Sequence, residues 1–286
     1  MRGPVVVEDE PELRPPSRSL AIAVAVALLS TLVIVAVAIQ VGLDRTSTPP
    51  PLPTGGVNIA LGTRAVAYKI TPKRTLYLHL FEPAELVSET DRAAIVFFHG
   101  GGLVQTPLNQ FKRQAEDLAG AGMLAVIAEY RVAWDGASFP EAADDARDTM
   151  AWVRQHSAEL GLDPSKIAVA GASAGGWMAA STEALPTEQR ANALILFDPA
   201  LGGSLTLPSE TYGGGGLPTL IVHGEKDRVT PVESSRRYCE AATHCELVVW
   251  SGGDQGFFNR DDAFQVVLER IKVFLRSIDF LGPKIN

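Results

Sequence analysis

Apolar and polar positions divide the 286-residue chain into a polar start, one long apolar run, a short spacer and a region of alternating patterns. The apolar run, 20–39, reads LAIAVAVALLSTLVIVAVAI and contains no charged side chain. At about 1.5 Å per helical residue, such a run matches the roughly 30 Å hydrocarbon core of a bilayer. The pattern predicts a transmembrane helix over 20–43.

Positive charges flank the apolar run unevenly. Arg2, Arg14 and Arg18 precede it, whereas only Arg45 follows it closely. Because Lys and Arg are enriched on the cytoplasmic side of a membrane, residues 1–19 are expected to form a cytoplasmic tail, with the rest of the chain outside the cytoplasm. The predicted protein is a single-pass membrane protein with an extracytoplasmic domain.

Cleavage of a signal peptide is the alternative interpretation of this start. The triplet Ala36-Val37-Ala38 offers an A-x-A cleavage site, whose use would release a secreted protein. However, the apolar run is longer than the about 7 to 15 residues of an ordinary signal peptide, and the triplet falls inside it. An uncleaved signal anchor is therefore favoured.

The spacer 44–56 contains TSTPPPLPTGG, which is rich in proline and then in glycine. A segment of this composition buries no core and forms a semi-stiff linker. The remaining residues, 57–286, are numerous enough for one domain with a sizeable hydrophobic core.

Within 57–286, short apolar runs alternate with stretches of helical period. The predicted strands are 65–70, 75–81, 94–98, 124–128, 167–170, 193–197, 218–222 and 246–250. The predicted helices are 108–121, 140–157, 174–185, 231–242 and 261–278. This alternation predicts an α/β fold with a mostly parallel, doubly wound sheet of about eight strands, the first two being antiparallel. Ligands bind such sheets at the carboxyl ends of the strands.

A glycine-rich turn follows the predicted strand 167–170. Residues 171–176 read GASAGG, a G-x-S-x-G pattern between a strand and a helix, and Ser173 is the candidate nucleophile. The glycines permit a sharp turn that exposes Ser173 at the positive end of the next helix. A turn that only packs the helix on the strand is the alternative. The chain has neither a G-x-G-x-x-G nor a P-loop pattern, so no nucleotide cofactor is expected.

A second glycine-rich turn, HGGG at 99–102, follows the predicted strand 94–98. The backbone N–H groups of Gly100 and Gly101, together with that of Ala174, are the candidate oxyanion hole. His99 is expected to be a structural hydrogen-bonding residue under this turn. A phosphate-binding turn is the weaker alternative, because no Lys follows.

A carboxylate follows the predicted strand 218–222 in the segment HGEKD, at 223–227. Asp227 lies at the sheet edge where a catalytic acid would orient an imidazole, and it is the candidate third member of a triad. A lone Asp in a loop more often caps a turn, so this assignment depends on the other motifs.

These motifs, FFHGGG, GLDPSKIAVAGASAGG, VHGEKDRVTP and GFFN, resemble those of the α/β-hydrolase superfamily. The similarity is to the carboxylesterase and acetyl-esterase branch that includes hormone-sensitive lipase, and it extends over nearly all of 57–282. Their order matches the order Ser, Asp, His of that fold. The resemblance implies hydrolysis of small acetyl or short-acyl carboxylic esters without a cofactor.

The sequence departs from this family at two places. Where the family has G-H-G-F, the chain has Gln255 in place of the catalytic histidine, and the segment 199–217 is short. A Gln side chain can hydrogen-bond to Asp227 and to Ser173, but it cannot take up and return a proton at neutral pH. Two hypotheses follow: a carboxylesterase-like hydrolase impaired by the missing histidine, or a catalytically inactive binding module on the same fold.

Charge and cysteine content restrict the partners further. The formal net charge of -8 argues against nucleic acid as a partner, and no metal-binding motif is present, so a small ester or similar ligand is expected. Cys239 and Cys245 can form a disulfide outside the cytoplasm, worth roughly 2 kcal/mol in the chain-entropy account. Two separate buried thiols are the alternative.

Overall fold

The computed structural model describes residues 57–58, 61, 63–83, 91–202 and 216–283, all within the compact unit Pro51–Asn286. The predicted tail, transmembrane helix and linker, 1–56, lie outside the described residues. Among the helices of the described part, none is both long enough and apolar enough to cross a membrane.

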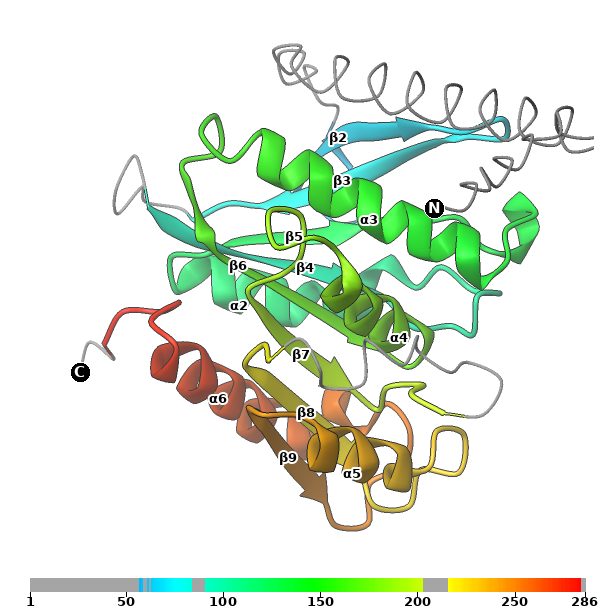
Figure 1. The fold of residues 1–286 in the computed structure, drawn as a ribbon, viewed down its shortest axis with the longest axis vertical. Helices are drawn as coiled ribbons and strands as arrows, with labels where there is room; N and C mark the ends of the chain where they lie inside the picture. Colours follow the sequence, from blue (N-terminus) through cyan, green and yellow to red (C-terminus); the bar gives the residue numbers. More distant parts are fainter. Residues whose placement is uncertain (1–56, 59–60, 62, 84–90, 203–215, 284–286) are drawn as a thin grey trace, which may run out of the picture. The chain divides into compact units, whose positions relative to one another are not determined.

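The described residues form one sheet with the strand order β1-β2-β3-β5-β4-β6-β7-β8-β9 (Figure 1). Strands from β1 to β5 in this order pair antiparallel, and those from β5 to β9 pair parallel. The predicted mostly parallel sheet is confirmed, with a two-residue β1 in addition. The strands are β1 Val57–Asn58, β2 Thr63–Ile70, β3 Thr75–Phe81, β4 Arg92–Phe98, β5 Leu124–Ala128, β6 Leu162–Ala172, β7 Ala193–Phe197, β8 Thr219–Gly224 and β9 Cys245–Trp250.

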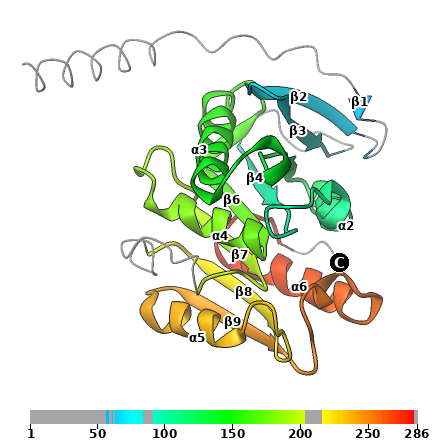
Figure 2. The same cartoon turned by 90° about the vertical axis from the view of Figure 1, so that its right-hand side faces the viewer.

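Helices cover both faces of the sheet, which is why the central strands are continuous apolar runs (Figure 2). Strands β5 and β7 are buried at every position. Side chains of α3, α4 and α5 contribute to the core on one face, and those of α2 and α6 to the core on the other. The helices are α2 Lys112–Gly120, α3 Phe139–Gln155, α4 Ala174–Ser181, α5 Val232–Ala241 and α6 Asp261–Ser277.

Helix α3 illustrates how the sequence sets an element. Its start is a capping box, in which the backbone N–H of Ser138 donates to the Glu141 carboxylate at 2.9 Å. Four residues at helical spacing are then fully buried against the sheet: Ala142, Ala146, Met150 and Val153. The predicted amphipathic helix over 140–157 is therefore confirmed to within two residues.

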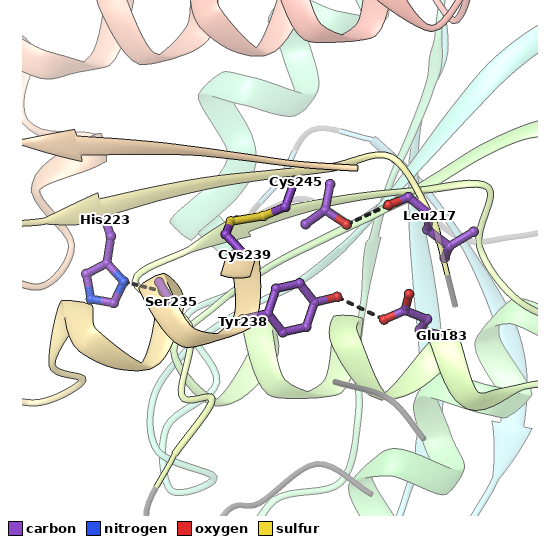
Figure 3. Close-up of a disulfide and its surroundings, with 8 residues drawn as sticks. Glu183, Leu217, His223, Ser235, Tyr238, Cys239 and Cys245 are labelled. Atoms are coloured by element: carbon purple, nitrogen blue, oxygen red, sulfur yellow. Dashed lines mark hydrogen bonds between the residues drawn. A yellow bond between two sulfur atoms is a disulfide. The ribbon is translucent and has the colours of Figure 1, made fainter. Parts of the chain in front are cut away.

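A disulfide joins Cys239 of α5 to Cys245 at the start of β9, with 5.1 Å between their Cα atoms (Figure 3). Beside it, the buried hydroxyl of Tyr238 donates to the carboxylate of Glu183 at 2.8 Å. This link fastens α5 to the start of β9, the last strand of the sheet.

Parallel register brings four strand ends to one edge of the sheet. Phe98 at the end of β4 is paired with Gly171 of β6, and Ala172 is paired with Phe197 at the end of β7. Phe197 in turn is paired with Val222 near the end of β8. The turns that follow these strands are consequently neighbours, although they are up to about 130 residues apart in sequence.

Candidate active site

Ser173 occupies a strained turn between β6 and α4. Its backbone has φ 51° and ψ −118°, a region that a non-glycine residue adopts at a cost of about 1–3 kcal/mol. Three backbone hydrogen bonds fix this conformation: Ser173 N–H donates to Phe197 O at 3.0 Å, and Ser173 O accepts from Trp177 and Ala200. The serine is thus held at the apex of the turn, at the N-terminus of α4.

The glycines of this turn are required by close packing. A Cβ atom at Gly171 would collide with the backbone of Gly175, and one at Gly175 would collide with the carbonyl groups at the end of β4. The turn therefore does pack the helix on the sheet, and the same close approach places Ser173 beside the loop after β4.

The glycines of that loop, 100–102, line a cavity of about 360 Å³ together with Ser173. Gly101 has a φ of 110°, and Gly100 and Gly101 both border the cavity. Ala174 is the first residue of α4 and is buried. The backbone N–H of Gly100 already donates to the side-chain oxygen of Gln110 at 2.7 Å, so this predicted oxyanion donor is occupied in the structure.

Gln255 lies in the loop after β9 and reaches the serine. Its Nε2 donates a hydrogen bond to Ser173 Oγ at 3.1 Å, and its side chain lines the same cavity. The position that the resemblance assigns to histidine is therefore adjacent to the nucleophile. In this contact the Gln255 amide donates a hydrogen bond to the serine oxygen, because an amide nitrogen only donates. A general base would instead accept the hydrogen bond of the serine hydroxyl.

Asp227 is buried in the turn after β8, where its own neighbours satisfy it. Its carboxylate accepts from the N–H groups of Val229 and Thr230, at 2.8 and 3.0 Å, and from the Thr230 hydroxyl at 2.6 Å. Gln255 is not among its donors in the described chain. Of the two hydrogen bonds expected of Gln255, the structure contains only the one to Ser173.

Asp198, which the sequence analysis missed, is the second buried carboxylate of the site. It follows β7 with a φ of 41°, and it lines the Ser173 cavity. Its Oδ1 accepts from Gly224 N–H and its Oδ2 from Gly256 N–H, both at 2.8 Å. Asp198 could have been identified from the sequence because it comes directly after the apolar run of β7. Asp227 is identified in the same way, from its place after the apolar run of β8.

Burial raises the pKa of Asp198 to about 7. The two backbone N–H groups oppose this increase, and the nearby charges of Asp227 and Asp254 add to it. Asp198 therefore titrates close to neutral pH, while its hydrogen bonds join the ends of β7 and β8 to the Gln255 loop.

His223 and His99 lie near the site but are engaged elsewhere. His223 Nε2 is 2.6 Å from the carbonyl oxygen of Thr230, and its Nδ1 is 2.7 Å from the hydroxyl of Ser235 (Figure 3). His99 Nδ1 is 2.6 Å from the carbonyl oxygen of Gly100. Burial lowers the pKa of both imidazoles, that of His99 to about 4. Neither imidazole is hydrogen-bonded to Ser173 among the described residues.

Asp198, His223 and Asp227 form the group of described residues that comes nearest to a metal site, with one potential ligand atom of each within 4.8 Å of the others. All three side chains already have hydrogen-bond partners, which are backbone N–H groups, a carbonyl oxygen and hydroxyls. These partners favour a hydrogen-bond network over metal coordination.

Proteins similar to this chain include esterases. A protein family described as having the alpha/beta hydrolase fold matches residues 95–215. The ethyl acetate hydrolase of Pseudomonas putida is 34% identical over 151 residues, which are 50% of this chain and 46% of that protein. The chain thus matches less than half the length of this curated relative.

Solved structures extend the similarity. Esterase 2 of Thermogutta terrifontis, phosphorylated by paraoxon, superposes with a TM-score of 0.71 and 36% identity, covering 82% of this chain and 98% of that one. The same esterase with propionate bound gives a TM-score of 0.69 and 34% identity, over 83% and 99% of the two chains. The strained turn at Ser173 and the glycine-rich loop after β4 form the site, and the match covers nearly all of a solved relative. The chain therefore belongs to the α/β-hydrolase family and has esterases as its homologues.

Proposed function

We propose that the protein is a serine hydrolase of small acetyl or short-acyl carboxylic esters whose turnover is slow because Gln255 replaces the proton carrier. The observation that carries the proposal is the position of Ser173 Oγ, which lies at the apex of the strained turn between β6 and α4 and is 3.1 Å from Gln255 Nε2. The names of the relatives support the substrate class, since one hydrolyses ethyl acetate and another was solved with propionate bound.

In this proposal, Ser173 Oγ attacks the ester carbonyl carbon, the bond to the alcohol oxygen breaks, and the serine proton reaches that leaving oxygen through solvent water. Water then hydrolyses the acyl-Ser173 ester, which releases the acid and restores the serine hydroxyl. The N–H groups of Gly101 and Ala174 stabilise the developing oxyanion, and that of Gly100 joins them when Gln110 releases it. The positive end of α4 adds to this stabilisation. Gln255 orients the serine hydroxyl, but it neither accepts the serine proton nor delivers one to the leaving alcohol.

The missing proton carrier sets the scale of the expected rate. In subtilisin, removing the catalytic Ser or His lowers kcat by roughly 2 × 10⁶. The oxyanion hole and substrate binding alone leave roughly 10³–10⁴ over the reaction in water. We therefore expect turnover that is slow and still above the uncatalysed rate.

A catalytically inactive binding module is the second candidate. It is favoured by the direction of the Gln255 hydrogen bond and by the engagement of His99 and His223 with carbonyl oxygens. Such a protein would hold an ester, or the acid derived from it, in the Ser173 cavity without releasing alcohol.

We further propose that residues 20–43 anchor the protein in a membrane with the hydrolase domain outside the cytoplasm. The support is the uncharged run 20–39 and the excess of arginine before it. A secreted form, cleaved within this run, is the alternative.

Hydrolysis of p-nitrophenyl acetate and butyrate by the purified full chain in detergent tests the enzymatic proposal. We expect slow release of p-nitrophenol that falls at least about tenfold in Ser173→Ala, together with labelling of Ser173 by a fluorophosphonate. Equal rates for the two proteins and no labelling would contradict hydrolysis. Binding of the ester without alcohol release would then favour the binding module.

A further inference from the structure

A second cavity, of about 330 Å³, lies beside the 99–110 loop and has a different set of lining residues from the Ser173 cavity. Its volume is at the small end of the range of ligand pockets, about 300–1,000 Å³. The proposed hydrolysis does not involve this second cavity. The lining residues that decide its chemistry are Arg74, His99, Leu108, Glu129, Trp134 and Asp135.

His99 is one of the residues that line this cavity, and its ring has an unused hydrogen-bond acceptor. Since a carbonyl oxygen only accepts, the Nδ1 of His99, at 2.6 Å from Gly100 O, must carry the ring proton. The low pKa of His99, about 4, keeps the ring neutral, so its Nε2 is a lone-pair acceptor. This atom is buried and has no partner among the described residues, a state that costs about 1–3 kcal/mol. A ligand with an O–H or N–H donor relieves that cost.

Carboxylates make the rest of the polar wall rich in acceptors. Arg74 pairs with Glu129 at 2.6 Å and with Asp135 at 3.1 Å, so two carboxylates face one guanidinium. Each carboxylate oxygen has more than one acceptor position. A ligand with several hydroxyl groups can therefore bind to this wall without displacing Arg74.

Trp134 provides a fixed aromatic surface at the same cavity. Its side chain is 77% exposed, although its Nε1 donates to Val104 O at 2.8 Å and Lys73 Nζ donates to its carbonyl oxygen at 2.9 Å. These bonds hold in place a large ring that is exposed to solvent. Such a ring presents an apolar face to the C–H side of a cyclic ligand.

We propose that this cavity binds a small uncharged polyol, with a single sugar ring as the best-matched form. The hydroxyls donate to His99 Nε2 and to the carboxylates of Glu129 and Asp135, while one face of the ring packs on Trp134. A quaternary ammonium ion satisfies the carboxylates and the aromatic ring, but it has no donor for His99 and is repelled by Arg74. The proposal does not depend on ester turnover.

Saturation-transfer NMR with the full-length Ser173→Ala protein tests the site independently of hydrolysis, in a detergent that has no sugar headgroup. The probes are the methyl glycosides of glucose, galactose and xylose, together with glycerol, and choline and ethanolamine are the cationic comparisons. Trp134→Ala removes the platform, Trp134→Tyr keeps an aromatic ring, and Val229→Ala is the control, because Val229 is an exposed apolar residue (70%) of the other cavity.

We expect at least one sugar or polyol to bind saturably, with Kd raised about tenfold or more by Trp134→Ala and little changed by Trp134→Tyr or Val229→Ala. In nitrogen-15 spectra, the ligand should also shift the His99 Nε2 resonance. Three results would overturn the proposal: no polyol binding, binding that is insensitive to Trp134→Ala, or preferential binding of the cations. Because the protein tested lacks Ser173, none of these results bears on the proposed hydrolysis.

Discussion

At the residue scale, the hydrogen bonds of the Asp198 carboxylate connect the strand ends of the site to the loop that contains Gln255. Asp198 accepts from the backbone of Gly224 and of Gly256, and Gly256 immediately follows Gln255. The Gln255 side chain is therefore placed over Ser173 by a loop that Asp198 holds. We regard Asp198 as a positioning residue, since its carboxylate makes no hydrogen bond to Ser173 in the described chain.

Replacing Asp198 with Asn should change how stability depends on pH. The carboxyl has an ordinary pKa of 3.8 and a folded-state pKa of about 7, so the folded protein keeps its proton to higher pH than the unfolded chain. Its contribution to the free energy of unfolding is fully present below the ordinary pKa and is lost as the pH rises through the folded value. Relative to Asp198→Asn, the native protein should lose a few kcal/mol between these two pH values.

Urea unfolding at a series of pH values measures this difference. Asp261→Asn is the matched control for removal of one carboxylate, because the Asp261 side chain is 96% exposed. If the stability of the native protein relative to Asp198→Asn stays constant or increases as the pH rises, Asp198 is not a carboxyl of raised pKa.

Residues such as Asp198 mark the limit of what the sequence predicts. The apolar run of β7 predicts that Asp198 lies at the same sheet edge as Ser173. The pattern does not indicate whether Asp198 or Asp227 lines the Ser173 cavity, and in the structure it is Asp198. Asp227 satisfies the same pattern and forms its hydrogen bonds with Val229 and Thr230. Likewise, the occupation of Gly100 N–H by Gln110 follows from the path of the intervening loop, which periodicity does not encode.

At the element scale, the order and type of the strands could be predicted because buried parallel strands are continuous apolar runs. Strand β6 is longer than the predicted 167–170, since Leu162 at its start pairs with Arg92 of β4, and the register shifts between Arg92 and Ala94. The predicted helix 108–121 begins as the 3-10 turn Leu108–Phe111, before α2. The apolar pattern carries no signal for either detail.

The elbow between β6 and α4 gives a prediction at this scale. Gly175→Ala should lower the free energy of unfolding by about 1–3 kcal/mol and abolish phosphonate labelling of Ser173, because the new Cβ collides with the end of β4. Thermal or urea unfolding measures the first effect and mass spectrometry the second. Gly120→Ala is the control, since a Cβ at the end of α2 meets no atom within 4 Å. Equal stability of the two variants would contradict the packing account.

At the scale of the whole molecule, the proposed anchor 20–43 determines where the hydrolase domain acts. The full chain should remain in membranes after extraction with alkaline carbonate, and a variant lacking 1–56 should be released. Protease added outside intact cells should reach the domain of the full chain. Release of the full chain by carbonate would contradict the anchor, and a shortened secreted product would establish cleavage instead.

The central claim is that the Ser173 site has the geometry of an esterase and lacks one proton carrier. The most direct test is hydrolysis of p-nitrophenyl acetate by Gln255→His, compared with the native chain and with Gln255→His carrying Ser173→Ala. We predict a gain of about 10²–10⁴ over the native chain, lost when Ser173 is removed, because a general acid–base group contributes about that much. An unchanged rate in Gln255→His would contradict the claim.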